Sequence, residues 1–173
     1  MGIIIKKMIH ANRKKSYSNF SEVKNIGIVC DASNRENFAS IAGFNQKMQE
    51  RNIEVKILGY YPGKNLPNDY TAIRYMTFFS RKDINFFYQP VASEINNFIN
   101  YRFDILIDVN FKKLFPLRCI ASLSNASFKV GLLEPDNVHT PLDLMMEIVN
   151  PVDVEDYLHQ VLHYLEMINS VEV

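Results

Sequence analysis

The stretch from residue 103 to residue 133 constrains the fold of this chain more than any other. It holds two apolar runs, 103–110 and 127–133, separated by a segment whose apolar residues repeat at helical spacing. Short runs that are apolar on both faces are typical of strands buried in a parallel sheet. A strand, a crossover helix and a second strand make a right-handed βαβ unit. The sequence therefore predicts an α/β fold, a three-layer Rossmann-like arrangement around a mostly parallel sheet.

Similar patterns lie on both sides of this unit. We expect strands at 25–31, 53–59, 73–79 and 142–149, and helices at 33–51, 91–101 and 153–168. Ser33 and Glu36 have the spacing of a capping box at the first helix, and Asp153 is the expected cap of the last. The aromatic run 84–88 fits either a hairpin with the preceding strand or a loop after it, and the pattern leaves both open.

Length and composition predict one folded domain. The 173 residues are 47% hydrophobic and 22% charged, which are ordinary values for a globular chain that buries its own core. We expect a basic N-terminal helix or arm over residues 1–20, followed by a single Rossmann-like domain over residues 21–173. No apolar run approaches the roughly 20 residues of a membrane span, and the short run Ile3–Ile5 is too brief for a signal peptide.

The two cysteines, Cys30 and Cys119, have no metal-ligand spacing and no nearby partner in the sequence. Both fall in apolar patterns, so we expect buried thiols, as in a protein of the reducing cytoplasm. His159 and His163 stand four residues apart on the last predicted helix, but they lie off its apolar stripe. Since the usual His-Glu-x-x-His context is missing, we expect no metal site there.

Charge is balanced overall but unevenly distributed. The formal net charge of zero argues against a general nucleic-acid-binding protein. Residues 1–24 are strongly basic, whereas residues 130–173 carry nine acids and no lysine or arginine. Two solvated surfaces explain this pattern, and so does attraction within the chain, across a homodimer or to another protein partner. The apolar and basic residues 4–9 also fit a helix lying on an anionic membrane surface, a peripheral contact.

Candidate binding residues are selected by a rule of topology. In an open parallel sheet, ligands bind beyond the carboxyl ends of the strands, where the strand order reverses. The first such loop offers Asp31, Ser33 and Asn34 beside a helix N-terminus. Free backbone N–H groups there suit an anion, although Asp31 opposes one and the residues also suit a purely structural cap.

Two further loops carry polar side chains in equivalent positions. The loop after the central strand offers Asp108, Asn110, Lys112 and Lys113, which suit a phosphate or sugar hydroxyls or, alternatively, a solvated turn. The loop after residue 133 offers Glu134, Asp136 and His139, a set suited to a hydroxyl-rich ligand. The expected ligand is therefore small and either anionic or sugar-like.

Complete catalytic and cofactor motifs are missing from the sequence. There is no G-x-G-x-x-G fingerprint, no Walker lysine and no G-x-S-x-G elbow, so we expect no cofactor. The residues leave open whether the chain is an enzyme and favour a module that binds a ligand or a partner. The alternatives are an enzyme acting on sugars or nucleotides and a membrane-surface adaptor that uses the basic N-terminal segment.

The strand 103–109 and the segment 119–131 carry a family resemblance. An aspartate on each side of an apolar strand, then a helix and a strand ending in Gly131, is similar to the acceptor-side N-terminal half of heptosyltransferase-type GT-B glycosyltransferases. That resemblance covers about 30 residues and implies a Rossmann-like domain with a catalytic base at the position of Asp31. The whole chain more closely resembles an uncharacterised bacterial family of unknown function whose members are about this long.

The chain departs from the glycosyltransferase pattern in two respects. Those enzymes have a glycine-containing loop after the first strand, where this chain has the segment 32–34, Ala-Ser-Asn. They also have a second domain for the nucleotide-sugar, which has no counterpart in this sequence. The resemblance therefore implies a solitary scaffold that retains the architecture and lacks the donor site.

Overall fold

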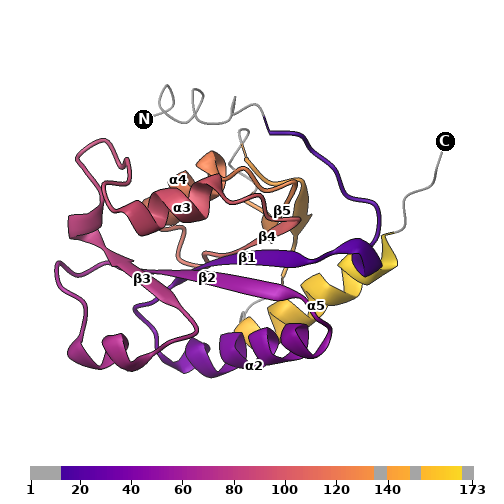
Figure 1. The fold of residues 1–173 in the computed structure, drawn as a ribbon, viewed down its shortest axis with the longest axis horizontal. Helices are drawn as coiled ribbons and strands as arrows, with labels where there is room; N and C mark the ends of the chain where they lie inside the picture. Colours follow the sequence, from indigo (N-terminus) through magenta and orange to yellow (C-terminus); the bar gives the residue numbers. More distant parts are fainter. Residues whose placement is uncertain (1–12, 135–139, 149–152, 169–173) are drawn as a thin grey trace.

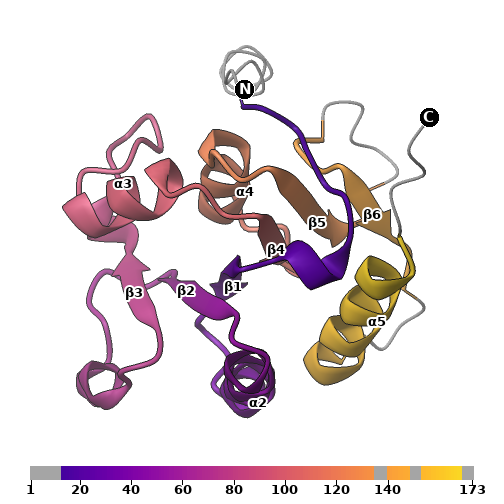
Figure 2. The same cartoon turned by 45° about the vertical axis from the view of Figure 1, so that its right-hand side comes forward.

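A single six-stranded sheet forms the centre of the fold in a computed structural model of the chain, which describes residues 13–134, 140–148 and 153–168. All neighbouring strands pair in parallel. The strands are β1 (Asn25–Asp31), β2 (Glu54–Tyr61), β3 (Thr77–Ser80), β4 (Ile105–Val109), β5 (Phe128–Leu132) and β6 (Leu144–Met146). Their order across the sheet is β3-β2-β1-β4-β5-β6 (Figure 2). The predicted α/β, Rossmann-like architecture is confirmed.

Helices cover both faces of this sheet, giving three layers (Figure 1). The α-helices are α2 (Glu36–Glu50), α3 (Ser93–Asn100), α4 (Phe115–Leu123) and α5 (Val154–Met167). One hydrophobic cluster joins α2 and α5 to the sheet, and a second joins α3 and α4 to its other face. Because side chains alternate along each strand, neighbouring residues contribute to opposite clusters, and this explains why the strands are apolar throughout.

The long helices begin and end where local chemistry requires it. Asp153 caps α5 by accepting hydrogen bonds from the backbone N–H groups of Glu155 and Asp156 at 2.7 and 3.1 Å. This confirms the predicted cap, which satisfies two of the donors that a helix N-terminus leaves free. At the end of α2, Asn52 adopts a φ of 60°. Asparagine tolerates this left-handed conformation better than most residues, so the chain can turn there into β2.

The extended segment before β1 is fastened to the far side of the sheet. Arg13 binds both carboxylate oxygens of Asp143 at 2.7 Å, and it also donates to the backbone carbonyls of Ala126 and Ser127. A single guanidinium nitrogen, Nη2, donates to both oxygens, and the charge on each partner strengthens these hydrogen bonds. Of the predicted N-terminal helix or arm over residues 1–20, residues 13–19 form no helix, and Phe20 begins a 3-10 helix, Phe20–Glu22. Residues 1–12 lie outside the described part of the chain.

A buried lysine in β5 was not anticipated from the sequence. Lys129 is almost fully enclosed, and its ammonium nitrogen lies 2.6 Å from the carbonyl oxygen of Ala121 and 3.2 Å from that of Ser122. Both carbonyls belong to the last turn of α4, where helical C=O groups lack intrahelical partners. Burial, reinforced by the positive charge of Arg13, lowers the pKa of Lys129 to about 7.

Several predicted elements differ in extent from those observed. The strand expected at 73–79 is only β3, since the preceding residues turn as a 3-10 helix at Asn68–Ala72. The run 84–88 forms no strand and turns back through a single bridge between Ile84 and Pro90. The helix expected at 91–101 is shortened to α3, and the strand expected at 142–149 to β6.

Two expectations concern the chain as a whole. Cys30 and Cys119 are both buried and unbridged, as predicted. Among the helices of the described residues, none combines the length and apolar character needed to cross a membrane.

Candidate functional site

The strand order reverses between β1 and β4, and this places a candidate crevice at their carboxyl ends. The chain leaves β1 toward β2 on one side and leaves β4 toward β5 on the other. The two loops that follow, 32–35 and 110–114, diverge from this point. Ligands of open parallel sheets bind at such a junction, so these two loops form the candidate ligand site.

A lysine joins these two loops. The ammonium group of Lys112 lies 2.8 Å from the carboxylate of Asp31 and 2.9 Å from the hydroxyl of Ser33. Burial alone would raise the pKa of Asp31, but hydrogen bonds from Lys112 and from Ser33 outweigh burial and lower it. Asp31 is therefore ionised at neutral pH. The structure thus brings Lys112 of one predicted loop together with Asp31 and Ser33 of the other.

The capping box predicted from Ser33 and Glu36 is wrong. The side-chain oxygen of Asn34 accepts a hydrogen bond from the backbone N–H of Glu36 at 3.1 Å. Helix α2 begins only at Glu36, with Arg35 in the flanking position. Ser33 lies too early to cap the helix because the backbone first bends over Asp31, which accepts from the N–H of Ser33 at 2.8 Å.

Asn110 shapes the loop after β4. Its side-chain amide accepts from the N–H of Leu114 at 2.7 Å and donates to the carbonyl of the same residue at 2.9 Å. Lys113 closes the turn through its N–H to the carbonyl of Asn110, with a left-handed φ of 55°. Asn110 therefore holds the backbone that directs Lys112 toward β1, while Lys113 remains exposed to solvent.

Asp108 is the most unusual residue of the crevice. Its Oδ1 atom is enclosed and has no hydrogen-bond partner among the described residues. Burial raises the pKa of this carboxyl to about 7, although the positive charge of Arg118 and the backbone N–H of Asn110 act in the opposite direction. An enclosed carboxylate without a full set of partners is costly, and such groups occur disproportionately at functional sites.

The position of Asp108 follows from the register of the sheet. Asp108 is opposite Val29 in β1, so Asp31, two residues further on, lies on the same face as a diagonal neighbour. Strand spacing and rise place their Cα atoms about 8 Å apart. On the other side is Gly131 of β5, where an added Cβ would approach that of Asp108 to 3.2 Å. The side chain of Leu142 already fills the space that a Cβ at Gly131 would need, so this flank of Asp108 is closely packed.

An ion pair borders the crevice on the side of α4. Arg118 projects from α4 and pairs with Glu134, one of the predicted ligand residues. Both side chains are mostly buried, at 24% and 20% exposure. Sequence reasoning missed Arg118, although a single arginine within the apolar residues of this helix was a usable signal. The predicted candidates Asp136 and His139 lie outside the described residues.

The described part of the crevice can therefore offer both acceptors and donors. Acceptor oxygens come from Asp31 and Asp108, and donors from Lys112, Ser33 and Arg118. Within the described residues, no group of three or more histidine, cysteine or acidic side chains is arranged to hold a metal ion. What the carboxyl ends of β1 and β4 provide is a set of hydrogen-bonding groups on neighbouring strands.

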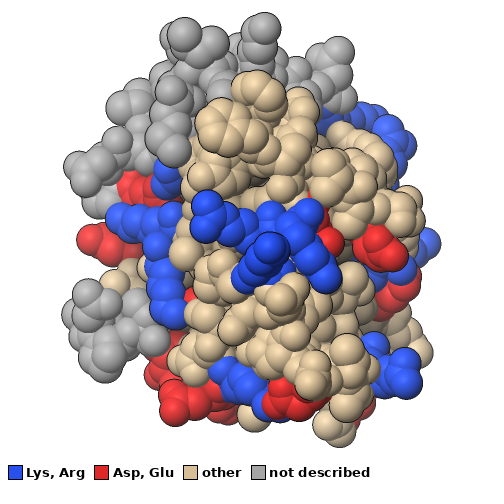
Figure 3. All heavy atoms as spheres, turned by 90° about the vertical axis from the view of Figure 1, so that its left-hand side faces the viewer, with Lys and Arg blue, Asp and Glu red and all other residues tan. Residues whose placement is uncertain are grey.

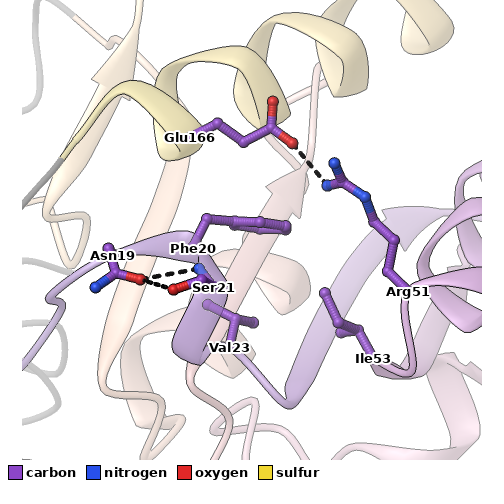
Figure 4. Close-up of a pocket in the computed structure, with 7 residues that line it drawn as sticks. All are labelled: Asn19, Phe20, Ser21, Val23, Arg51, Ile53 and Glu166. Atoms are coloured by element: carbon purple, nitrogen blue, oxygen red, sulfur yellow. Dashed lines mark hydrogen bonds and ion pairs between the residues drawn. The ribbon is translucent and has the colours of Figure 1, made fainter.

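A separate pocket opens at the opposite, amino end of the sheet (Figure 4). Its volume is about 580 Å³, and it is lined by Asn19, Phe20, Ser21, Val23, Arg51, Ile53 and Glu166. The two charged residues in this lining, Arg51 and Glu166, pair with each other at 2.6 Å, and the Arg51 guanidinium lies over the ring of Phe20. These charged groups therefore satisfy each other, as Lys112 and Asp31 do at the carboxyl end of the sheet.

Comparison with protein families identifies the chain at the level of a family. The model of a family of unknown function, DUF6913, matches residues 3–168. The chain belongs to this family. No curated protein matches the chain. The DUF6913 assignment confirms the predicted membership of a family of unknown function, and it carries no assigned reaction.

Proposed function

We propose that this DUF6913 chain binds a small, uncharged, hydroxyl-rich molecule, such as a sugar, in the crevice between β1 and β4. The observation that carries the proposal is the enclosed Oδ1 of Asp108, which has no partner among the described residues. A ligand hydroxyl supplies the missing donor once the side chains that enclose this atom move aside. The short glycosyltransferase resemblance, read as an acceptor-side sugar scaffold, agrees with this ligand class.

Charge favours an uncharged ligand over an anion. Lys112 is already neutralised by Asp31, and Arg118 by Glu134, so neither cation is available to a phosphate without breaking an ion pair. A phosphate would also meet the carboxylate of Asp31 close to Asp108. Hydroxyl groups avoid this conflict because they donate to the carboxylates and accept from the cations at the same time.

A thermal-shift screen tests the proposal. The panel contains free sugars, phosphosugars, nucleotides and nucleotide-sugars, and we expect a free sugar to raise the melting temperature of the wild type. A ligand at 100 times its Kd stabilises the folded state by about 2.7 kcal/mol, a shift of several degrees. Asp108→Asn keeps the side-chain shape but loses the charged acceptor, so it should reduce this ligand-induced shift.

Glu166→Gln is the matched control, since Glu166 is an ion-paired acid at the opposite end of the sheet. It should retain the full ligand-induced shift. A panel without any stabilising sugar would refute the proposal. So would a sugar whose effect is the same in Asp108→Asn as in the wild type.

A second candidate is acid–base chemistry on the same ligand, with Asp108 as the proton carrier. Its pKa of about 7 lies near the working pH, where a carboxyl group both accepts and releases protons. Asp31, the base implied by the family resemblance, has a lowered pKa and an ion-pair partner, so it is better suited to positioning Lys112. A turnover rate that follows the titration of Asp108, measured on any sugar found in the screen, would support the reaction.

We also infer a reducing compartment, the cytoplasm, as the working location. Two buried, unbridged thiols support this inference, since they are typical of proteins kept in reducing surroundings. A homodimer, a protein partner and the bacterial origin of the family remain predictions, as do the single domain over residues 21–173 and the absence of general nucleic-acid binding.

A further inference from the structure

An aromatic loop protrudes between β3 and α3, at the upper left of Figure 1. It spans residues 84–91 and carries three consecutive aromatic side chains. Phe86 is 91% exposed and Phe87 60% exposed, and Val91 adds a further apolar side chain at 61% exposure. Large adjacent apolar side chains seldom remain in water without a reason, because burying them is favourable.

Hydrogen bonds fix the shape of this aromatic loop. The side-chain oxygen of Asn85 accepts from the backbone N–H groups of Phe87 and Gln89, both at 2.9 Å. The backbone of Asn85 donates to the carbonyl of Gln89 and accepts from the N–H of Tyr88. A bridge between Ile84 and Pro90 closes the base of the loop. The two phenylalanines are therefore projected outward by an ordered turn.

The base of the aromatic loop is also packed on the body of the protein. The ring of Tyr88 meets that of Phe115, at the start of α4, edge-on at 4.6 Å. Tyr88 adopts a left-handed φ of 58° to do so. The rings of Phe86 and Phe87, by contrast, contact each other, with their centroids 5.6 Å apart. One aromatic side chain thus anchors the loop while two form its exposed tip.

Basic side chains gather on the same end of the molecule. Figure 3 views this end and shows a band of lysine and arginine side chains across its middle. Arg81 and Lys82 begin the segment that leads into the loop, and Lys113 belongs to the turn before α4. All three are exposed and make no ion pair within the described part of the chain.

We infer that this end of the molecule binds the surface of an anionic membrane. Phe86 and Phe87 enter the interface between headgroups and acyl chains, and Arg81, Lys82 and Lys113 lie beside the lipid phosphates. Apolar tips flanked by cations are held at such surfaces by apolar burial together with electrostatic attraction. This inference is independent of the proposed sugar site and does not use the N-terminal residues 1–12.

The shape of the tip favours a bilayer over a protein partner. A narrow convex loop needs a matching hollow on a rigid partner, whereas a fluid bilayer accommodates it without one. The surrounding positive charge complements a layer of anionic headgroups, whose attraction acts on every lysine and arginine near the surface. The occupant that fits both the projecting rings and the distributed charge is therefore an anionic lipid surface.

Vesicle co-sedimentation tests the inference with the full chain. We expect the wild type to bind vesicles of phosphatidylcholine with 30% phosphatidylserine, and to bind pure phosphatidylcholine far less. Phe86→Ser/Phe87→Ser should lower the partition coefficient at least about tenfold. Arg81→Glu/Lys82→Glu should lower it by a similar factor on anionic vesicles, and added salt should weaken the wild type.

The matched control replaces two exposed apolar side chains on α5, far from the loop. Tyr164→Ser/Met167→Ser removes groups that are 47% and 62% exposed, and it should bind as the wild type does. Circular dichroism verifies that every variant is folded. Equal binding by the wild type and the double phenylalanine variant would overturn the inference. Failure of the wild type to bind anionic vesicles would also overturn it. So would self-association of the wild type that the phenylalanine changes abolish, because the loop would then bind a second copy of the chain instead of a membrane.

Discussion

Replacing Asp108 by asparagine should stabilise the protein, and it should do so only above mildly acidic pH. The carboxyl of Asp108 has a pKa of about 7 in the folded chain, compared with about 3.9 for an aspartate in an unfolded chain. Between these values the folded state binds a proton that the unfolded state does not. The contribution of Asp108 to stability is therefore complete below pH 4 and lost as the pH rises through 7.

The size of this loss follows from the same two values. A difference of roughly 3 pKa units corresponds to a ceiling of about 4 kcal/mol, because each unit is worth about 1.4 kcal/mol. Since Asp108 as a whole residue is only partly buried, we expect the loss in the free energy of unfolding to be about 2 kcal/mol at pH 8. Asparagine has nearly the same shape and no charge, so Asp108→Asn should recover that amount above pH 7 and gain little at pH 4.

Urea unfolding followed by far-UV circular dichroism measures this difference. The free energies of unfolding of the wild type and Asp108→Asn are compared at pH 4.5, 6, 7 and 8, so that titrations common to both cancel. Asp69→Asn serves as the control, because Asp69 is an exposed aspartate in an ion pair with Arg35, and such pairs contribute under about 1 kcal/mol. The reasoning would be refuted if Asp108→Asn were less stable than the wild type at pH 8. It would also be refuted if the free energy of unfolding of Asp108→Asn changed with pH in the same way as that of the wild type.

Two other residues give further predictions. Burial lowers the pKa of Lys129 to about 7, so between pH 7 and pH 10 the unfolded chain binds a proton that the folded chain does not. Lys129 therefore makes the free energy of unfolding rise with pH over this range, by at most about 1.4 kcal/mol per pH unit. Lys129→Met should lack this rise, as measured by the difference between urea midpoints at pH 7 and 9. Asp153→Ala removes the cap of α5 and should cost about 1 kcal/mol at pH 7; an unchanged melting temperature would contradict this role for Asp153.

The architecture was predictable because the apolar pattern of each helix and strand can be recognised within that segment alone. The runs around Ile107 and Val130 are apolar on both faces, and the α5 segment combines a cap with a continuous apolar stripe. These signals depend only on neighbouring residues. The order of the strands does not, because it is set by which apolar faces meet after the chain has collapsed. The topological rule nevertheless selected Asp31 and Lys112, and the structure shows them in contact.

The failures have physical causes at particular residues. The run 84–88 is apolar enough for a strand, but the side chain of Asn85 captures two backbone N–H groups and forms a turn. Ser33 has the right spacing for a capping box, but its N–H donates to Asp31 and its hydroxyl accepts from Lys112, so it does not cap the helix. The burial of Lys129 was not predictable, because no local pattern indicates a lysine that donates hydrogen bonds to the last carbonyls of a helix packed on the sheet.

The bond between Arg13 and Asp143 joins residues 130 positions apart, and this separation affects how the protein is made. At a synthesis rate of about 5 to 20 residues per second, Asp143 leaves the ribosome roughly 6 to 26 seconds after Arg13. During that interval the segment leading into β1 lacks this ion pair, although the carbonyls of Ala126 and Ser127, which also accept from Arg13, emerge earlier. The segment around Arg13 is thus fully secured only late in synthesis, and nascent chains that end before Asp143 lack this ion pair.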